Sequence, residues 1–229
     1  MDLLQVREQE IFETLKNIIK FRFVIIGGYA VNTYTLPRFS VDCDIVVINE
    51  EEADTISHEL EKIGYKKQNP KNDIPYTGSF VRYEKEIRKN FSVSIDILVK
   101  DVLDRQTNSR FSAEWIFENS SIKILKGKTV QDQIRLQIIN LDALITMKII
   151  SCRKTDIRDV FMMITNAKDT AWIKEEINKR TNFNERITKL DNKTSSKNFK
   201  DNLQGVFGYL EETTFKKHLN AIKKLSKIS

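Results

Sequence analysis

Two aspartates separated by a single residue, Asp42 and Asp44, are the first residues in this sequence whose types and spacing could do chemistry. They come directly before an apolar run at residues 45–48 that is typical of a buried strand. Residues two apart in a strand point to the same face, so both carboxylates should project together while Val41 and Cys43 face a core. Adjacent carboxylates repel unless a cation lies between them, and a hard, oxygen-seeking ion such as Mg²⁺ suits them.

A glycine pair, Gly27 and Gly28, lies upstream between an apolar run at residues 23–26 and a helix-compatible run at 29–34. Backbone without side chains can approach a ligand closely, and the free N–H groups of a following helix favour an anion. We therefore predict strand, glycine turn, helix, loop and strand, with a phosphate site beside the cation site. Taken singly, the acids suit a solvated strand end and the glycines a plain turn; their joint spacing favours a catalytic site.

Residues 91–99 predict a strand with a third carboxylate. Apolar residues alternate there with Ser92, Ser94 and Asp96, so Asp96 is the only acid on the second face. If this strand lies beside the one that carries Asp42 and Asp44, three carboxylates converge. The alternative is a solvent-facing aspartate on an amphipathic strand.

These features together resemble the signature of the nucleotidyltransferase superfamily related to DNA polymerase beta. The glycine pair and the Arg-x-Ser-x-Asp-x-Asp pattern of residues 38–44 are most similar to the AbiEii-type abortive-infection toxins. The resemblance implies transfer of a nucleoside monophosphate from an NTP such as ATP to an acceptor hydroxyl. It also implies two Mg²⁺ (or Mn²⁺) ions held by three carboxylates, one ion lowering the pKa of the acceptor hydroxyl and the other steadying the triphosphate. Carried onto this chain, the metal-binding and catalytic residues are Asp42, Asp44 and Asp96, and the phosphate contacts are Gly27, Gly28, Arg38 and Ser40.

A second group of candidates lies on and just after the helix expected at residues 141–152. Lys148 is on this helix among apolar residues, where an amphipathic helix rarely places a lysine unless the amine reaches a cleft or an anion. AbiEii-like proteins carry a lysine on such a helix and an RDxxD-like element at the start of the next, which implies nucleotide contacts from Lys148 and Asp159. The alternative is structural: Asp156 would be an N-cap with Asp159 three residues on, which stabilises a helix end without a ligand.

Composition narrows the class of protein. The 38 basic and 32 acidic residues give a net charge of +6, compatible with NTP or RNA as a partner and equally with a solubilising surface. No apolar stretch approaches a membrane-spanning length and no secretory signal is present, so we expect a cytoplasmic protein without a membrane partner. Cys43 and Cys152 are expected to be buried thiols. With only His58 and His218 in the chain, a histidine metal site is disfavoured, and His58 is expected at the surface.

The expected fold class is α/β (α+β), with a mixed nucleotidyltransferase sheet flanked by helices in a domain at residues 1–139 and a helical C-terminal domain at 140–229. Helices are expected near residues 3–20, 50–63, 141–152, 157–164, 170–180, 203–210 and 215–225, and strands near 23–26, 45–48, 79–83, 91–99, 121–125 and 133–138. Residues 68–78 predict turns, residues 84–90 a hairpin or loop, and residues 181–202 a polar loop.

Two basic segments leave alternatives open. The turn at residues 126–128 is either a solvated hairpin tip or a phosphate contact. The last helix carries lysines on its wet side that form either a solvated face or a guide for a nucleic-acid acceptor. These residues are Lys216, Lys217, Lys223, Lys224 and Lys227.

The function predicted from the sequence is that of a metal-dependent nucleotidyltransferase whose acceptor is RNA, protein or a small molecule. One role for it is the toxin of a toxin–antitoxin pair. Two alternatives are a catalytically silent nucleotide-binding regulator and an antibiotic-type small-molecule nucleotidyltransferase. The sequence indicates neither the base of the NTP nor the oligomeric state.

Overall fold

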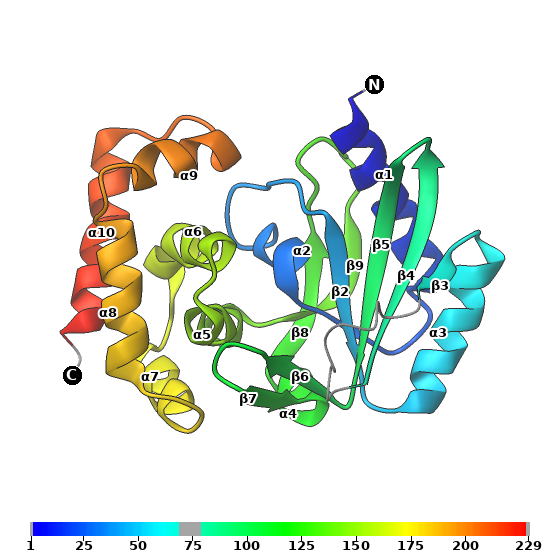
Figure 1. The fold of residues 1–229 in the computed structure, drawn as a ribbon, viewed down its shortest axis with the longest axis horizontal. Coiled ribbons are helices and arrows are strands. Elements are labelled where there is room, and N and C mark those ends of the chain that lie inside the picture. Colours follow the sequence, from blue (N-terminus) through cyan, green and yellow to red (C-terminus); the bar gives the residue numbers. More distant parts are fainter. Residues whose placement is uncertain (1, 69–78, 228–229) are drawn as a thin grey trace. The chain divides into compact units, whose positions relative to one another are not determined.

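The structure is a computed structural model that describes residues 2–68 and 79–227 (Figure 1). Nearly all of the turn-rich segment expected at residues 68–78 lies outside the described residues. The chain forms two compact units, which we call the sheet unit (Met1–Thr33, Pro37–Leu103 and Arg110–Ile139) and the helical unit (Tyr34–Leu36, Asp104–Ser109 and Asn140–Ser229). The division into a domain at residues 1–139 and another at 140–229 stays a prediction.

A seven-stranded mixed sheet forms the centre of the sheet unit, in the order β3-β4-β5-β2-β1-β9-β8. β2 is parallel to β5 and β1 is parallel to β9, whereas the other neighbouring pairs are antiparallel. The predicted α/β class with a mixed sheet is therefore confirmed. The strand bounds are β1 (Val24–Ile25), β2 (Asp42–Val47), β3 (Lys66–Gln68), β4 (Ser79–Arg88), β5 (Phe91–Val99), β8 (Ser120–Leu125) and β9 (Ile134–Ile139).

Two strand predictions need correction. Residues 84–88, expected in a hairpin or loop, continue β4, because β5 offers an antiparallel partner along this length, with Glu84 opposite Ser94. The structure also contains elements that were not predicted from the sequence: the two-stranded sheet of β6 (Asp101–Asp104) and β7 (Ser109–Ser112) and the short helix α4 (Ala113–Glu118). These elements have too few residues to show a periodic pattern.

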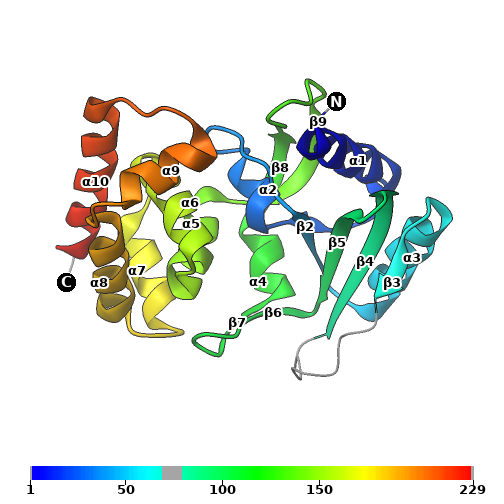
Figure 2. The same cartoon turned by 45° about the horizontal axis from the view of Figure 1, so that its top comes forward.

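Two long helices pack against the sheet and against each other (Figure 2). α1 (Leu3–Ile18) buries Ile11, Phe12 and Leu15 completely, and α3 (Glu50–Lys62) begins at the N-cap Asn49 and is followed by Gly64 with φ +94°. Glycine adopts this left-handed conformation without steric cost, which suits a helix C-terminus.

The buried carboxylate of Glu8 on α1 ties this helix to the turn at residues 126–130. Its oxygens accept hydrogen bonds from the backbone N–H groups of Lys128 (2.7 Å), Thr129 (2.7 Å) and Val130 (3.1 Å). The hydroxyl of Thr129 donates a further bond to it at 2.7 Å. Backbone donors of this basic turn therefore hold an internal anion and are not available to a phosphate.

The helical unit contains helices that pack on one another around apolar faces. Their bounds are α5 (Leu141–Ser151), α6 (Lys154–Met163), the 3₁₀ helix η1 (Ile164–Asn166), α7 (Thr170–Asn178), α8 (Phe183–Thr194), α9 (Phe199–Phe207) and α10 (Glu212–Ser226). None of the helices within residues 2–68 and 79–227 has both the length and the hydropathy needed to cross a membrane.

The prediction of a polar loop at residues 181–202 is wrong, because α8 occupies most of this segment. The side chain of Asn182 accepts a hydrogen bond from the backbone N–H of Glu185 and so caps the helix. Phe183, Ile187 and Leu190 then form a buried stripe at helical spacing. The surrounding Thr, Asn and Lys residues hid this stripe in the composition of the segment.

Phe161 of α6 lies at the centre of an aromatic cluster in the helical unit. Its ring centroid is 5.0 Å from that of Phe199 and 5.0 Å from that of Phe215. His218 is buried beside it, with Nδ1 at 2.7 Å from the carbonyl oxygen of Phe161, whereas His58 on α3 is exposed. The histidine of α10 therefore contributes to packing.

Candidate active site

The sheet brings the three predicted acids to one face. β2 and β5 are parallel, and their register places Asp44 opposite Asp96 and Asp42 opposite Ser94. Since residues two apart share a face, Asp42, Asp44 and Asp96 project to the same side of the sheet. The side chain of Asp42 is 37% exposed and that of Asp96 only 6%, so the site runs from solvent into the sheet.

The opposite face of β2 is apolar and buried, as predicted, except at Val41. Cys43, Ile45 and Val47 are buried as expected. Val41 is 62% exposed, because the strand begins at Asp42 and Val41 precedes its first paired residue. Burial of the apolar face fixes which way the two aspartates point.

The glycine pair lies directly against the acids and the preceding loop. A β-carbon on Gly27 would overlap the carboxylate of Asp44, and one on Gly28 would overlap the hydroxyl of Ser40. Gly27 also has φ +64°, a left-handed conformation that other residues adopt at a cost. The helix α2 (Gly27–Val31) begins at this residue, two positions earlier than predicted. The glycines thus let Asp44 and Ser40 approach the backbone.

Arg38 is held near the same turn by Asn32, which is completely buried. The side-chain amide of Asn32 donates to the carbonyl oxygen of Arg38 at 3.0 Å, and the backbone N–H of Arg38 donates to Oδ1 of Asn32 at 3.0 Å. One guanidinium nitrogen of Arg38 would lie 3.3 Å from a β-carbon on Gly28. Gly28 is therefore flanked by the guanidinium of Arg38 and the hydroxyl of Ser40.

Arg82 on β4 is a residue of this site that the sequence analysis did not single out. Its Nε donates to Oδ1 of Asp96 at 2.8 Å and its Nη2 to Oδ2 at 2.6 Å, so the guanidinium holds both carboxylate oxygens. The same Nη2 lies 3.6 Å from Oδ2 of Asp42. Only the antiparallel register of β4 and β5, which pairs Arg82 with Asp96, could have revealed this contact.

Asp96 and Arg82 influence each other's ionisation. Burial raises the pKa of Asp96, and the hydrogen bonds and charge of Arg82 only partly offset this, while Asp42 and Glu84 raise it further. The hydrogen bond to Asp96 holds the pKa of Arg82 above its ordinary value. The charged form of Asp96 therefore depends on having a cation beside it.

The carboxylates of Asp42 and Asp44 fit a divalent cation, since oxygen ligands on one face of a strand are what Mg²⁺ prefers. Asp96 could join them only after the Arg82 guanidinium moves away, because that guanidinium engages both of its oxygens. Accordingly, within residues 2–68 and 79–227, no three acidic, histidine or cysteine side chains are gathered as a metal site. The side chain of Arg82 is 38% exposed, so it has solvent to move into.

Lys148, Asp156 and Asp159 form a buried ionic cluster in the helical unit. Nζ of Lys148 lies 3.0 Å from Oδ1 of Asp156 and 2.9 Å from Oδ2 of Asp159. Asp156 also accepts a hydrogen bond from the hydroxyl of Ser151 at 2.6 Å and from the backbone N–H of Arg153 at 3.2 Å. Arg153 is the N-cap of α6 and Asp156 occupies its third position, so the predicted N-cap role of Asp156 is wrong.

Charges around Asp156 decide its ionisation. Burial by itself would raise its pKa, but the charges of Lys148 and Arg153 and the hydrogen bonds from Ser151 and Lys148 outweigh burial and lower the pKa to about 2. The carboxylate is therefore a stable counterion for the buried ammonium of Lys148. The two form part of the internal framework of α5 and α6.

The predicted site residues thus fall into two groups. The sheet unit gathers Gly27, Gly28, Arg38, Ser40, Asp42, Asp44 and Asp96 around the ends of β1 and β2 and the neighbouring β5. The helical unit holds Lys148 and Asp159.

No protein-family model matches the sequence, and no curated protein matches it significantly. Solved structures do match it. MenT4, a nucleotidyltransferase toxin from Mycobacterium tuberculosis H37Rv, is 13% identical with a TM-score of 0.61, over 99% of this chain and 84% of that one. JHP933 from Helicobacter pylori is 13% identical with a TM-score of 0.52, over 100% of this chain and 94% of that one.

A third similar structure is ANT(2″)-Ia, solved in complex with adenylyl-2″-tobramycin. It is 12% identical with a TM-score of 0.50, over 76% of this chain and 96% of that one. At these identities the likeness concerns the fold. The chain therefore has the nucleotidyltransferase fold, as its glycine pair and its spaced aspartates predicted.

Proposed function

We propose that the protein transfers a nucleoside monophosphate from an NTP to an acceptor hydroxyl. The observation that supports this most strongly is the placement of Asp44 against Gly27 with Asp42 and Asp96 on the same face of the sheet. The fold adds support, because MenT4 is a nucleotidyltransferase and ANT(2″)-Ia was solved with an adenylylated compound. In such a transfer the acceptor oxygen forms a bond to the α-phosphorus while the bond to pyrophosphate breaks.

Asp42 and Asp44 would hold the divalent cation, Mg²⁺ or Mn²⁺, and Asp96 would complete a site for two ions after Arg82 releases it. Bound ions would neutralise charge on the triphosphate and on the attacking oxygen. The protein's own contribution to phosphoryl transfer is mainly position and charge, so the carboxylates need to be fixed before substrate arrives. Burial of Cys43 and Ile45 on the opposite face of β2 supplies that rigidity.

The triphosphate would lie by the glycine turn. Arg38 and Ser40 flank Gly28, so a guanidinium and a hydroxyl are available for phosphate oxygens there. The space beside each glycine is already filled by Asp44 and Ser40, so phosphate contacts would come from exposed backbone N–H groups and from these side chains. Lys148 and Asp159 are kept as further proposed nucleotide contacts, with the condition that Lys148 exchanges an internal carboxylate for a phosphate.

RNA, protein and small molecules are all candidate acceptors, and the toxin of a toxin–antitoxin pair remains one proposed role. MenT4 is a nucleotidyltransferase toxin and ANT(2″)-Ia was solved in complex with adenylyl-2″-tobramycin, so similar folds occur in a toxin and in a protein that holds an adenylylated small molecule. A nucleotide-binding regulator without turnover is the alternative of a different class. It would bind NTP without releasing pyrophosphate.

The test is transfer of label from α-³²P-labelled NTPs, each incubated with Mg²⁺ or Mn²⁺ and with total RNA, protein or small-molecule pools. Asp42→Asn and Asp44→Asn should each lower transfer by roughly 100-fold or more, because each removes a carboxylate that would hold the divalent cation, and it is the cation that offsets the developing negative charge. Asp54→Asn, at an exposed aspartate of α3, is the matched control and should leave transfer unchanged. Binding of NTP without transfer in any pool would favour the regulator, and equal activity of all three variants would contradict the proposed site.

A further inference from the structure

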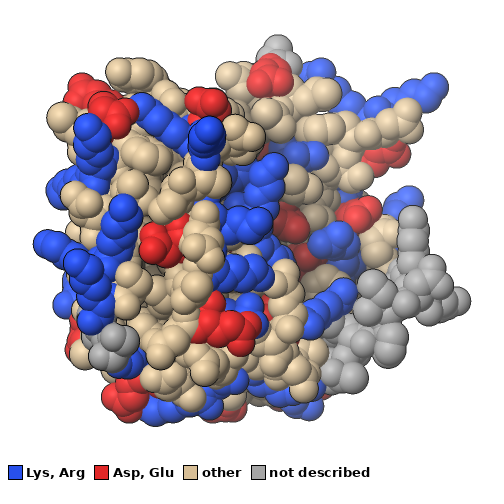
Figure 3. All heavy atoms as spheres, turned by 60° about the vertical axis from the view of Figure 1, so that its left-hand side comes forward, with Lys and Arg blue, Asp and Glu red and all other residues tan. Residues whose placement is uncertain are grey.

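The exposed face of α10 carries a row of lysines that the proposed catalytic site does not use. A surface hollow of about 980 Å³ in the helical unit is lined by five lysines and a single acid, Asp191 of α8. The lysines are Lys216, Lys217, Lys223, Lys224 and Lys227. Figure 3, which turns the C-terminal helices forward, shows clusters of lysine and arginine side chains on this face.

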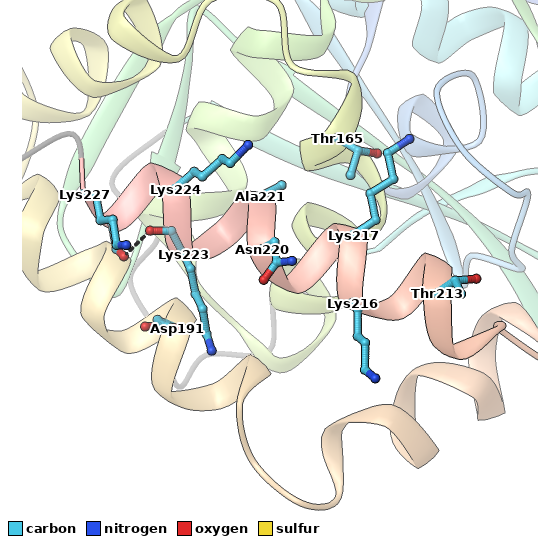
Figure 4. Close-up of a pocket in the computed structure, with 11 residues that line it drawn as sticks. Thr165, Asp191, Thr213, Lys216, Lys217, Asn220, Ala221, Lys223, Lys224 and Lys227 are labelled. Carbon is cyan, nitrogen blue, oxygen red and sulfur yellow. Dashed lines mark hydrogen bonds between the residues drawn. The ribbon is translucent and has the colours of Figure 1, made fainter.

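The lysines form two parallel rows along the helix. Positions seven apart lie near one another on a helix surface, so Lys216 and Lys223 share one row while Lys217 and Lys224 share the other. Figure 4 shows Lys217 and Lys224 extending to the side on which Thr165 lies, and Lys216 and Lys223 to the side of Asp191. Figure 4 shows the shorter side chain of Asn220 on the side of Lys216 and Lys223 and that of Ala221 on the side of Lys217 and Lys224, and both line the hollow.

The ammonium groups that line this hollow lie close together on one helix with almost no carboxylate partners among the residues that the structure describes. Lys16, Lys85, Lys100 and Lys200 each form an ion pair at 3.4 Å or less. Within the described residues, no carboxylate pairs with the side chains of Lys217, Lys223, Lys224 or Lys227, and Lys216 has only a 3.8 Å contact with Glu212. Positive charges gathered in this way repel one another and lower the stability of the folded protein. A polyanionic ligand that neutralises them would explain why the cluster is present.

The length of the row favours an extended strand over a single phosphate. Residues 216–227 span about 16 Å at the helical rise of 1.5 Å per residue, the length of roughly five nucleotides at about 3.4 Å each. The exposed positions of this face, which include Thr213 and Asn220, are polar. A helix that binds a membrane surface needs large apolar side chains next to its basic ones, whereas the only apolar side chain among the described residues that line this hollow is the methyl group of Ala221.

We infer that the lysine rows of α10 bind the phosphate backbone of an RNA strand. Identification of that RNA as the acceptor of the transfer reaction rests on the proposed function; binding itself does not. Contacts to phosphates carry no base specificity, so the surface should accept RNA of any sequence, with an affinity that falls steeply with salt.

The experiment measures fluorescence anisotropy of a labelled single-stranded RNA of mixed sequence, titrated with the full chain at several NaCl concentrations. The test variant is K217Q/K223Q/K224Q. The matched control, K66Q/K89Q/K126Q, removes the same charge from three exposed lysines of the sheet unit. Neither variant should unfold at a lower temperature than the wild type, since all six side chains are exposed and the test variant removes charges that repel one another.

Each lost phosphate contact changes the slope of log affinity against log salt by about 0.7 for a single strand. The test variant should therefore lose about 2 from that slope and about 100-fold in affinity near 0.1 M NaCl. The control should retain wild-type binding, and K217R/K223R/K224R should restore it. Equal RNA affinity for the test and control variants would overturn the inference, as would lysine-dependent binding to phosphatidylserine vesicles without RNA binding.

Two further measurements separate this inference from the proposed function. Asp42→Asn/Asp44→Asn should bind the RNA like the wild type while losing transfer. Lysine-dependent RNA binding without any transfer activity would leave the inference standing and refute the proposed function. Transfer activity with RNA binding that does not depend on these lysines would refute the inference alone.

Discussion

Gly27 and Asp44 occupy complementary space: a β-carbon on Gly27 would overlap the carboxylate of Asp44. The two residues come from different elements, the start of α2 and the middle of β2. The backbone N–H of Ile26 donates to the carbonyl oxygen of Asp44 at 3.1 Å, which holds the two segments together. The glycine turn and the acid therefore form one structural unit, and a change in either should be felt by the other.

Gly27→Ala should lower the free energy of unfolding by at least about 2 kcal/mol, because the new side chain adds left-handed strain to the overlap with Asp44. Urea unfolding followed by circular dichroism measures this. Gly205→Ala on α9 is the matched control, since no atom lies within 4 Å of its β-carbon, and it should stabilise the protein by up to about 1 kcal/mol. A neutral effect of Gly27→Ala would mean that Asp44 does not lie against the turn.

Arg82→Met should make the stability of the fold depend more strongly on a divalent cation than it does in the wild type. It leaves the buried carboxylate of Asp96 without its counterion, at a cost of about 1–3 kcal/mol, near the lower end because Arg82 is partly exposed. A metal ion that binds Asp42, Asp44 and Asp96 would then replace the guanidinium. Saturating Mg²⁺ should therefore raise the Tm of Arg82→Met more than that of the wild type.

The double variant Arg82→Met/Asp96→Asn provides the control for this effect. It has neither the guanidinium nor the charge that the guanidinium neutralises, so most of the additional Mg²⁺-induced rise in Tm should disappear. Equal Mg²⁺ effects in the single and double variants would show that Asp96 takes no part in holding the ion.

The Lys148–Asp156 pair should give stability a specific pH dependence. The pKa of Asp156 is about 2 in the folded protein, below its ordinary value of 3.8, so its contribution is present above pH 3.8 and is lost as the pH falls toward 2. The loss should amount to about 2 kcal/mol, from 1.36 kcal/mol per pKa unit. Denaturant unfolding between pH 5 and pH 2, compared for wild type and Asp156→Asn, measures it; a variant with an unchanged pH profile would contradict the assignment.

Glu8→Gln should weaken the attachment of α1 to the turn at residues 126–130. The amide replaces one acceptor oxygen by a donor and removes the charge, while three backbone N–H groups still point at this side chain. We expect a loss of about 1–3 kcal/mol in unfolding free energy. Glu13→Gln on the exposed side of the same helix should change the free energy of unfolding by less than about 0.5 kcal/mol. Equal effects of the two variants would contradict a stabilising role for the hydrogen bonds that Glu8 accepts from the turn.

The parts of the fold that the sequence predicted best have a clear hydrophobic period. β5 was expected at residues 91–99 and spans Phe91–Val99, because an apolar residue stands at every second position along this whole length. α8 was missed because Phe183, Ile187 and Leu190 are separated by polar residues that dominate the composition. α10 was found because Phe215, Leu219, Ile222 and Leu225 recur at helical spacing with polar residues between them.

Within the site, local spacing predicted the shared face of Asp42 and Asp44, whereas pairing between distant segments could not be seen. Asp96 was found because it is the only acid on the polar face of its strand. Arg82 was not, since its partner depends on the register of β4 against β5. The contacts of Lys148 with Asp156 and Asp159 likewise depend on how α5 and α6 pack, which no single segment specifies.

The most direct test of the central claim is a titration of the protein with Mn²⁺, followed by electron paramagnetic resonance of the free ion. The claim is that Asp42 and Asp44 hold a divalent cation at the glycine turn. The wild type and the control Asp54→Asn should bind Mn²⁺ alike, and the binding should strengthen when NTP is present. Asp42→Asn/Asp44→Asn should lose this binding while remaining folded; if it binds Mn²⁺ as the wild type does, with and without NTP, the account is contradicted.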